Sequence, residues 1–104
     1  MKIIIIGAGP GGYEAAIRAA QLDNEVVLIE KGHTGGTCLN VGCIPTKTLV
    51  KIAETVDAVN DAGKFGVMTG DYSLDEDVIF NRKAQVVDGL RKGVEFLFSG
   101  YKIL

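Results

Sequence analysis

A glycine-rich turn between an apolar run and a small-residue segment constrains the fold of this chain more than any other feature. The turn reads Gly7-x-Gly9-x-x-Gly12. Residues 2–6 before it are Lys-Ile-Ile-Ile-Ile, which is typical of a strand buried on both faces, as in a parallel sheet. Residues 13–22 after it are rich in alanine and predict a closely packed helix. The glycines therefore mark a sharp strand-to-helix turn.

A second apolar strand is predicted from Glu25 to Glu30. Strand, helix and strand within about 30 residues make a βαβ unit, whose crossover is expected to be right-handed. The sequence thus predicts an α/β fold of Rossmann-like type, with parallel strands and helices, of which only part is present.

The glycine turn lies where a dinucleotide-binding fingerprint requires it, after a strand and at the start of a helix. Gly7 would make the turn, Gly9 would let the backbone approach a pyrophosphate, and Gly12 would let helix and strand pack closely. Pro10 suits the first turn of a helix, where unpaired N–H groups attract phosphate. Glu30 ends the second strand, where an acidic side chain holds ribose hydroxyls. A tight turn without a ligand is the alternative, and the motif does not separate NAD from FAD.

Two cysteines lie five residues apart in the segment from Gly36 to Lys47, which reads Gly-Thr-Cys-Leu-Asn-Val-Gly-Cys-Ile-Pro-Thr-Lys. In a straight helix, residues at this spacing have Cα atoms roughly 8–9 Å apart. A disulfide needs at most about 7 Å, so a bond between Cys38 and Cys43 requires a break in the helix. Gly42 supplies the freedom for that break. Thiolate chemistry is favoured by a following helix N-terminus and by Lys47 one turn beyond Cys43.

The cysteine pair has four interpretations at this point. A redox-active pair is the first. The others are two buried thiols, a metal site with His33, and a purely structural bridge. The spacing of the three candidate metal ligands matches no usual zinc pattern, so no metal site is predicted.

The rest of the chain predicts helices joined by turns. Residues 31–42 read as a loop. A helix is expected from about Cys43 to before Gly63, with an apolar stripe along one side. The stripe consists of Leu49, Ile52, Ala53, Val56 and Val59. A short extended piece is expected at 65–68.

A third helix is predicted from a capping box at residues 73–76 to about Phe98, with Ser99-Gly100 as its C-cap. Its expected inner side is Ile79, Val86, Leu90, Val94 and Leu97. Residues 101–104 read as the opening of a strand. Two strands and three helices do not cover both faces of a parallel sheet, so we expect the chain to be part of a larger unit.

Composition argues against several classes of partner. The net charge is -2, and no basic patch of the kind that binds a phosphate backbone stands out. No apolar run is long enough to cross a bilayer. The apolar run at the start is too short for a signal peptide. We therefore expect a cytoplasmic protein that binds neither nucleic acid nor membrane.

The cysteine segment resembles the active-site segment of the class I pyridine nucleotide–disulfide oxidoreductases, and dihydrolipoamide dehydrogenase is its nearest likeness. Glutathione and mercuric reductases are similar, usually with Val in place of Leu39 and Ile44. The resemblance extends over the whole chain, because glycine turn, Glu30, cysteine segment and helices occur in family order. It implies that residues 1–104 are the N-terminal part of an FAD-binding domain. The remainder of that domain, an NAD domain and a dimerisation domain are absent.

The resemblance implies FAD as cofactor, with its pyrophosphate at Gly7, Gly9, Pro10 and Gly12. The ribose would lie at Glu30 with Lys31 beside it, and Gly36, Thr37 and Lys47 match positions that touch the flavin nucleotide. Cys38 would attack the substrate disulfide and Cys43 would lie beside the flavin.

The resemblance further implies a small disulfide or dithiol substrate and a homodimer at full length. The NAD or NADP site lies outside this chain, and so does the family's catalytic histidine, since His33 is the only histidine. Two other hypotheses stay open: a stand-alone nucleotide-binding module without catalysis, and a small thiol redox or metal protein without flavin.

Overall fold

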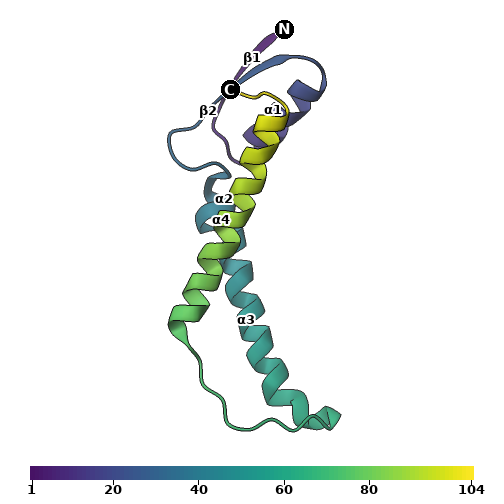
Figure 1. Cartoon of the computed structure of the whole chain (residues 1–104), viewed down its shortest axis with the longest axis vertical. Coiled ribbons are helices and arrows are strands. Elements are labelled where there is room, and N and C mark those ends of the chain that lie inside the picture. Colours follow the sequence, from purple (N-terminus) through teal and green to yellow (C-terminus); the bar gives the residue numbers. More distant parts are fainter.

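The computed structural model describes all 104 residues as an elongated α/β molecule of 62 × 25 × 18 Å. The sheet and first helix form one end, and two long helices run side by side to the other (Figure 1). The elements are β1 (Lys2–Ile6), α1 (Pro10–Gln21), β2 (Glu25–Ile29), α2 (Gly36–Val41), α3 (Cys43–Asp61), a 3-10 turn η1 (Ala62–Phe65) and α4 (Glu76–Gly100).

The sheet confirms the predicted βαβ unit. β1 and β2 pair in parallel, in register from Lys2 opposite Glu25 to Ile6 opposite Ile29. Leu104 bonds to the other edge of β2: the Leu28 N–H donates to its carbonyl at 2.7 Å, and its own N–H donates to Val26 at 3.2 Å. The position of Leu104 beyond β2 matches the Rossmann strand order 3-2-1. The predicted final strand is otherwise wrong, because residues 101–102 form a turn.

Burial of β1 on both faces is not observed. Ile5 faces α1, since a Cβ added at Gly12 would lie 3.7 Å from its Cγ2. Ile4 and Ile6 alternate to the opposite face, where they are 60% and 84% exposed. A parallel sheet is normally covered on both faces, and here α1 covers only one.

α1 begins at Pro10, three residues before the predicted start. Proline is favoured in the first turn of a helix because its fixed φ suits the helix and its missing N–H is not needed there. Of the alanines predicted to pack closely, Ala16 is completely buried and Ala19 and Ala20 are half-buried, whereas Ala15 is exposed. Asn24 ends the helix, donating to the Ala19 carbonyl at 3.0 Å.

The predicted loop at 31–42 contains the six-residue helix α2. Two glycines of the segment 31–42 have left-handed φ values, +104° at Gly35 and +65° at Gly36, as expected for irregular backbone. These angles lie at the N-cap and the first residue of the helix, which buries Leu39. The glycines therefore start the helix here.

The α3–α4 pair confirms both predicted helices but only part of each predicted apolar face. Ile52, Val56 and Val59 are half-buried, whereas Leu49 and Ala53 are exposed. On α4, Val87 is the buried residue and was not predicted, while the predicted Leu90 and Leu97 are 44% and 43% exposed. The reason is geometric: α4 lies beside α3, then α2, then α1 along its length, so one stripe cannot face all three (Figure 1).

The ends of α4 differ from the predicted caps. Asp75, not Ser73, is the N-cap, and its carboxylate accepts the Val78 N–H at 3.0 Å. The helix extends to Gly100, so Ser99 and Gly100 lie inside it and Tyr101 follows as C-cap.

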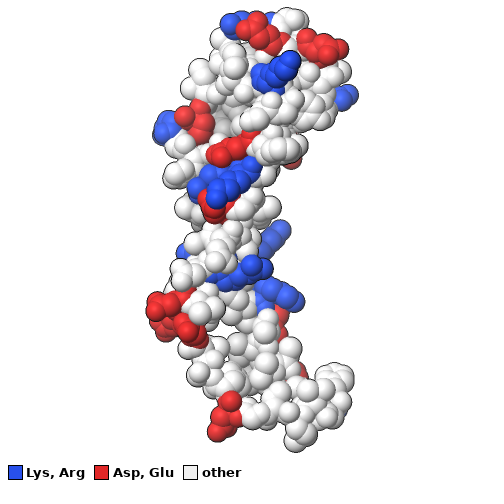
Figure 2. Space-filling view, viewed as in Figure 1, with Lys and Arg blue, Asp and Glu red and all other residues white.

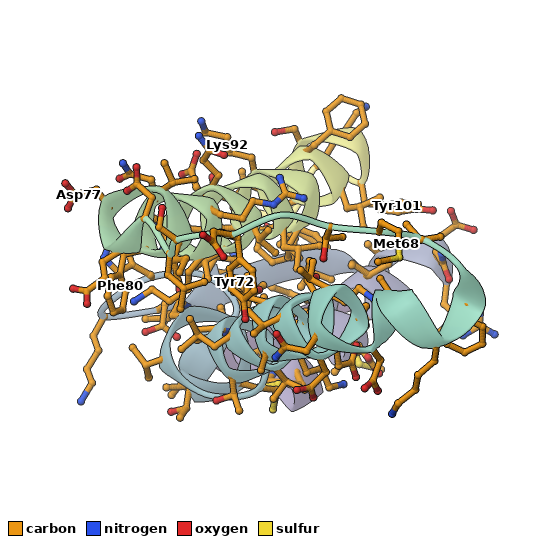
Figure 3. All side chains as sticks on the ribbon, turned by 90° about the horizontal axis from the view of Figure 1, so that it is seen from below. Met68, Tyr72, Asp77, Phe80, Lys92 and Tyr101 are labelled. Atoms are coloured by element: carbon orange, nitrogen blue, oxygen red, sulfur yellow. A yellow bond between two sulfur atoms is a disulfide. The ribbon has the colours of Figure 1, made fainter.

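The segment that leads to α4 contains no extended piece at 65–68, because η1 reaches Phe65. Tyr72 in this segment donates to the Asn60 side-chain oxygen at 2.7 Å, which ties the connection to α3 (Figure 3).

The surface carries both charge signs along the long axis of the face shown in Figure 2. Large apolar side chains are also exposed at both ends, such as Ile6 at 84% and Phe65 at 82%. None of the helices is both long and apolar enough to span a bilayer.

Candidate functional site

The glycine turn forms a backbone cradle at the start of α1. Gly7 has a φ of +100°, which favours glycine. A Cβ at Gly12 would overlap the Gly7 carbonyl group, so only glycine lets α1 pack this closely after β1. Gly9 caps α1 without any side-chain hydrogen bond. The first N–H groups of the helix are therefore not satisfied by a capping side chain, and they carry the positive end of its dipole.

The segment before α2 lies directly on this cradle. The Gly35 N–H donates to the Ala8 carbonyl at 2.8 Å. A Cβ at Gly36 would come within 2.7 Å of the Gly9 Cα, so glycine is required at this contact. The start of the cysteine segment and the glycine turn are thus one packed unit.

Glu30 turns its carboxylate back toward the cradle. One oxygen accepts the Ala8 N–H at 2.8 Å and the other accepts the Gly32 N–H at 2.8 Å. The hydrogen bond from Ala8, followed by that from Gly32, holds the pKa of Glu30 below its ordinary value. Glu30 and Lys31 line a cavity of about 360 Å³ with Ile6, Gly7 and Ile29, at the carboxyl ends of both strands.

Because the pKa of Glu30 is lowered on folding, its charge stabilises the fold at high pH. The contribution is complete above the ordinary pKa of 4.5 and is lost as pH falls through the folded-state value. We expect Glu30→Gln to lower the melting temperature near neutral pH, and the gap from the unmodified protein to close in acid. Glu14→Gln, which removes an exposed glutamate with no hydrogen bond, is the control. A gap that widens as pH falls below 4.5 would show that the sign is wrong.

The two cysteines form a disulfide with Cα atoms 4.6 Å apart. The predicted break in the helix is confirmed: α2 ends at Val41, α3 begins at Cys43, and Gly42 between them has φ -121° and ψ -105°. A Cβ at Gly42 would lie 3.0 Å from the Thr37 carbonyl oxygen, so the turn is tight there. Cys43 is exposed and Cys38 is half-buried.

Cys38 opens onto an apolar cavity of about 200 Å³ beside the glycine turn. Its walls come from α1, the cysteine segment and α4, and none carries a charged side chain. The lining residues are Pro10, Tyr13, Gly35, Cys38, Leu39, Ile44, Leu90 and Val94. Cys38 therefore lies in the wall of an uncharged pocket.

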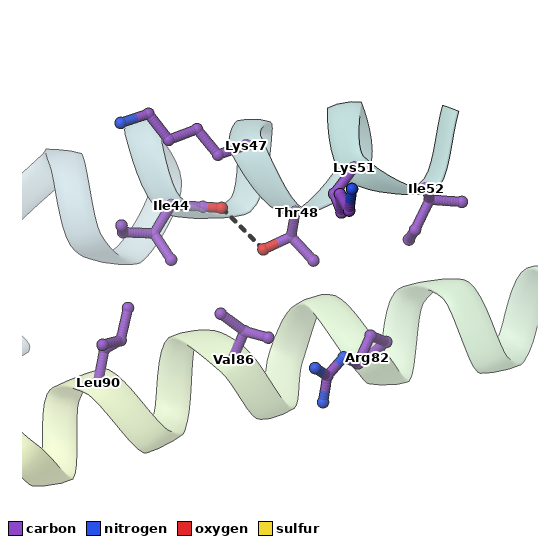
Figure 4. Close-up of a pocket in the computed structure, with 8 residues that line it drawn as sticks. All are labelled: Ile44, Lys47, Thr48, Lys51, Ile52, Arg82, Val86 and Leu90. Carbon is purple, nitrogen blue, oxygen red and sulfur yellow. Dashed lines mark hydrogen bonds between the residues drawn. The ribbon is translucent and has the colours of Figure 1, made fainter. Parts of the chain in front are cut away.

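Lys47 lies one turn beyond Cys43 on α3. Figure 4 shows its side chain running back toward the start of α3, on the side away from α4. It borders a cavity of about 300 Å³ between α3 and α4, to which Lys51 and Arg82 also contribute positive charge. Thr37 is exposed at the start of α2.

His33 is exposed. No group of three or more His, Cys, Asp or Glu side chains lies close enough together to hold a metal ion.

Sequence reasoning missed Asn40 and Arg91. The Asn40 side chain donates to the carbonyls of Thr34, just before α2, and Gly36, its first residue, and its oxygen accepts two hydrogen bonds from Arg91. A polar residue between two cysteines was visible in the sequence. Nothing in the sequence pointed to Arg91, which lies 51 residues further along.

These features fit a flavin nucleotide. The cradle is lined by backbone that a Cβ would fill, the helix N-terminus is free of a side-chain cap, and a charged acceptor lies at the strand ends. Such a donor set suits a pyrophosphate followed by a ribose.

The sequence model of the pyridine nucleotide-disulphide oxidoreductases matches residues 1–103, and the chain belongs to this family. It is 47% identical to dihydrolipoyl dehydrogenase of Bacillus subtilis (strain 168), over 99% of this chain and 23% of the relative. It is 52% identical to dihydrolipoyl dehydrogenase of Acholeplasma laidlawii, over 94% of this chain and 30% of the relative.

Among solved structures, the HOCl-induced flavoprotein disulfide reductase RclA from Escherichia coli is similar to this chain. The TM-score is 0.73 with 32% sequence identity, over 97% of this chain and 20% of RclA. The α/β fold of the chain is thus similar to one part of a flavoprotein disulfide reductase. The chain spans less than a third of the length of each of these relatives.

Proposed function

We propose that this chain is the flavin- and disulfide-bearing part of an FAD-dependent oxidoreductase similar to dihydrolipoamide dehydrogenase. Such an enzyme passes electrons between a dithiol, FAD and NAD(P). The observation that carries the proposal is the contact between the two motifs: the segment that leads into Cys38 packs on Gly9 and hydrogen bonds to Ala8. A phosphate cradle packed against the segment that carries the disulfide suits electron transfer between a bound nucleotide cofactor and a thiol substrate.

The cavity at Cys38 supports a small aliphatic dithiol as substrate. It is lined without charge by residues such as Tyr13, Leu90 and Val94. An apolar wall favours an aliphatic chain, whereas a charged peptide disulfide such as that of glutathione would lose hydration there without gaining a partner. This observation favours a dihydrolipoamide-like substrate over that of glutathione reductase.

The chemistry of the cysteines is thiol–disulfide exchange. A thiolate of the substrate attacks Cys38, the Cys38–Cys43 bond breaks, and Cys43 departs as a thiolate. The second substrate thiol, after losing its proton to a base, attacks the mixed disulfide and releases Cys38. The substrate is then oxidised by two electrons and the cysteine pair is reduced by two. A bound FAD would supply the redox chemistry that links this cysteine pair to NAD(P).

The chain's residues have distinct roles in this proposal. Gly7, Gly9, Pro10 and Gly12 hold the pyrophosphate, and Glu30 with Lys31 holds the ribose. Gly36, Thr37 and Lys47 contact the flavin nucleotide, with Lys47 supplying positive charge. Residues 1–104 are then the N-terminal part of the FAD domain of a cytoplasmic homodimer. The rest of the FAD domain, the NAD and dimerisation domains and the base belong to the remainder of that protein.

Purification of the full-length protein tests the proposal. We expect a yellow protein that contains one FAD per chain and that gains a long-wavelength thiolate-to-flavin absorption when dihydrolipoamide reduces it anaerobically. Reduced glutathione at the same concentration should have a much smaller effect. A colourless protein that binds nucleotides would favour the stand-alone nucleotide-binding module, and thiol exchange without flavin would favour the small thiol redox protein.

A further inference from the structure

Asn40 lies between the two cysteines and holds together three parts of the chain. Its amide nitrogen donates to the carbonyls of Thr34 at 3.0 Å and Gly36 at 2.9 Å. The bond to Thr34 holds the end of α2 against the segment before it, and the bond to Gly36 ties it to the first residue of α2, which packs on the glycine turn. Asn40 therefore links the cysteine segment to the backbone that packs on the glycine turn.

Arg91 completes this arrangement from α4. Its Nη2 and Nε donate to the Asn40 side-chain oxygen at 2.7 Å and 3.0 Å. Arg91 is half-buried and forms no salt bridge, so its charged donors are directed at a neutral amide. Hydrogen bonds with a charged donor are stronger than neutral ones. The bonds also fix the orientation of the Asn40 amide, because its oxygen must face Arg91 and its nitrogen the two carbonyls.

We propose that Asn40 and Arg91 form a positioning pair, which keeps the thiols of Cys38 and Cys43 in bonding geometry when the disulfide is open. The proposal rests on the proposed function only in requiring that this disulfide opens and closes. In the disulfide state, the covalent bond itself holds α2 against the start of α3. In the dithiol state only non-covalent contacts do so, and these hydrogen bonds keep the effective concentration of one thiol near the other high.

The direction of the effect follows from this difference between the two states. Without the pair, α2 gains freedom in the dithiol state, and closing the disulfide must order it again. Asn40→Ala and Arg91→Met should each shift the equilibrium toward the dithiol. We expect the equilibrium constant between disulfide and dithiol to change about three- to tenfold, which corresponds to the usual net contribution of one hydrogen bond.

An electrostatic role for Arg91 predicts the opposite sign. If its positive charge stabilised the thiolates, Arg91→Met would make the disulfide harder to reduce. The direction of the shift therefore separates a positioning role from a charge role.

The experiment equilibrates the full-length protein with mixtures of reduced and oxidised dithiothreitol, traps thiols by alkylation, and measures the disulfide fraction by mass spectrometry. Asn60→Ala and Arg82→Met are matched controls. The Asn60 side chain bonds only to Tyr72, near the end of α3 that lies away from the cysteines. Arg82 lies on α4, and its side chain forms no hydrogen bond or salt bridge. Neither control should move the equilibrium.

The double variant of Asn40 and Arg91 should shift the equilibrium no more than the larger single shift, because the two residues act as one unit. Arg91→Lys, which keeps a charged donor, should shift the equilibrium less than Arg91→Met does. No shift, or a shift toward the disulfide, would overturn the proposal. The readout does not need FAD, so a colourless unmodified protein would refute the proposed function without affecting this test.

Discussion

Cys43→Ser is expected to lower the dithiol-dependent activity of the full-length protein on the order of a thousandfold or more, because no disulfide can form. The reason is specific to the exchange step, in which Cys43 must leave Cys38 as a thiolate. A serine oxygen cannot form this bond. The variant should also lack the thiolate-to-flavin absorption of the reduced protein while keeping its FAD. Activity is measured as NAD reduction by dihydrolipoamide.

Val41→Ser is the matched control for this change. Val41 is 76% exposed and is the last residue of α2, two residues before Cys43. A serine at this position adds a hydroxyl to the same segment and leaves both cysteines in place. It should keep most of the activity. Full activity in Cys43→Ser would show that the Cys38–Cys43 disulfide takes no part in the reaction.

Gly12→Ala should prevent FAD binding, and it should destabilise the fold by about 1–3 kcal/mol or more, as overpacking does. The added methyl group would overlap the Gly7 carbonyl. Relief of this overlap must push α1 away from the strand and open the phosphate cradle. The measurements are FAD content after purification and the denaturation midpoint.

Gly11→Ala is the folding control for the same helix turn. A Cβ at Gly11 meets nothing within 4 Å, and the residue lies inside α1. Alanine should stabilise the helix by about 0.5–1 kcal/mol, opposite in sign to the change at Gly12. Equal stability effects at both positions would contradict the account of close helix–strand packing.

The sequence was sufficient for the features that depend on short-range pattern. The run at 2–6, the glycine turn and Glu30 predicted a βαβ unit because strand, turn and helix preferences agree there. The cysteine spacing predicted a helix break because a regular helix holds such residues too far apart for a disulfide. Both predictions depend on backbone geometry, which neighbouring residues determine.

Features that depend on distant contacts were not predictable in this way. The helix α2 forms because left-handed angles at Gly35 and Gly36 place it on the glycine turn, a contact that no local pattern shows. Burial of Val87 depends on the angle at which α4 crosses its neighbours. The bond between Asn40 and Arg91 joins residues far apart in the chain, and neither residue type is unusual for a solvated surface.

The central claim is that a flavin held by the glycine turn lies against the Cys38–Cys43 disulfide, and a crystal structure of the FAD-loaded protein tests it most directly. We expect the pyrophosphate to accept hydrogen bonds from N–H groups at the start of α1. The ribose hydroxyls should bond to Glu30, and Cys43 should contact the flavin ring. FAD bound away from the glycine turn, or a flavin ring out of contact with both sulfurs, would contradict it.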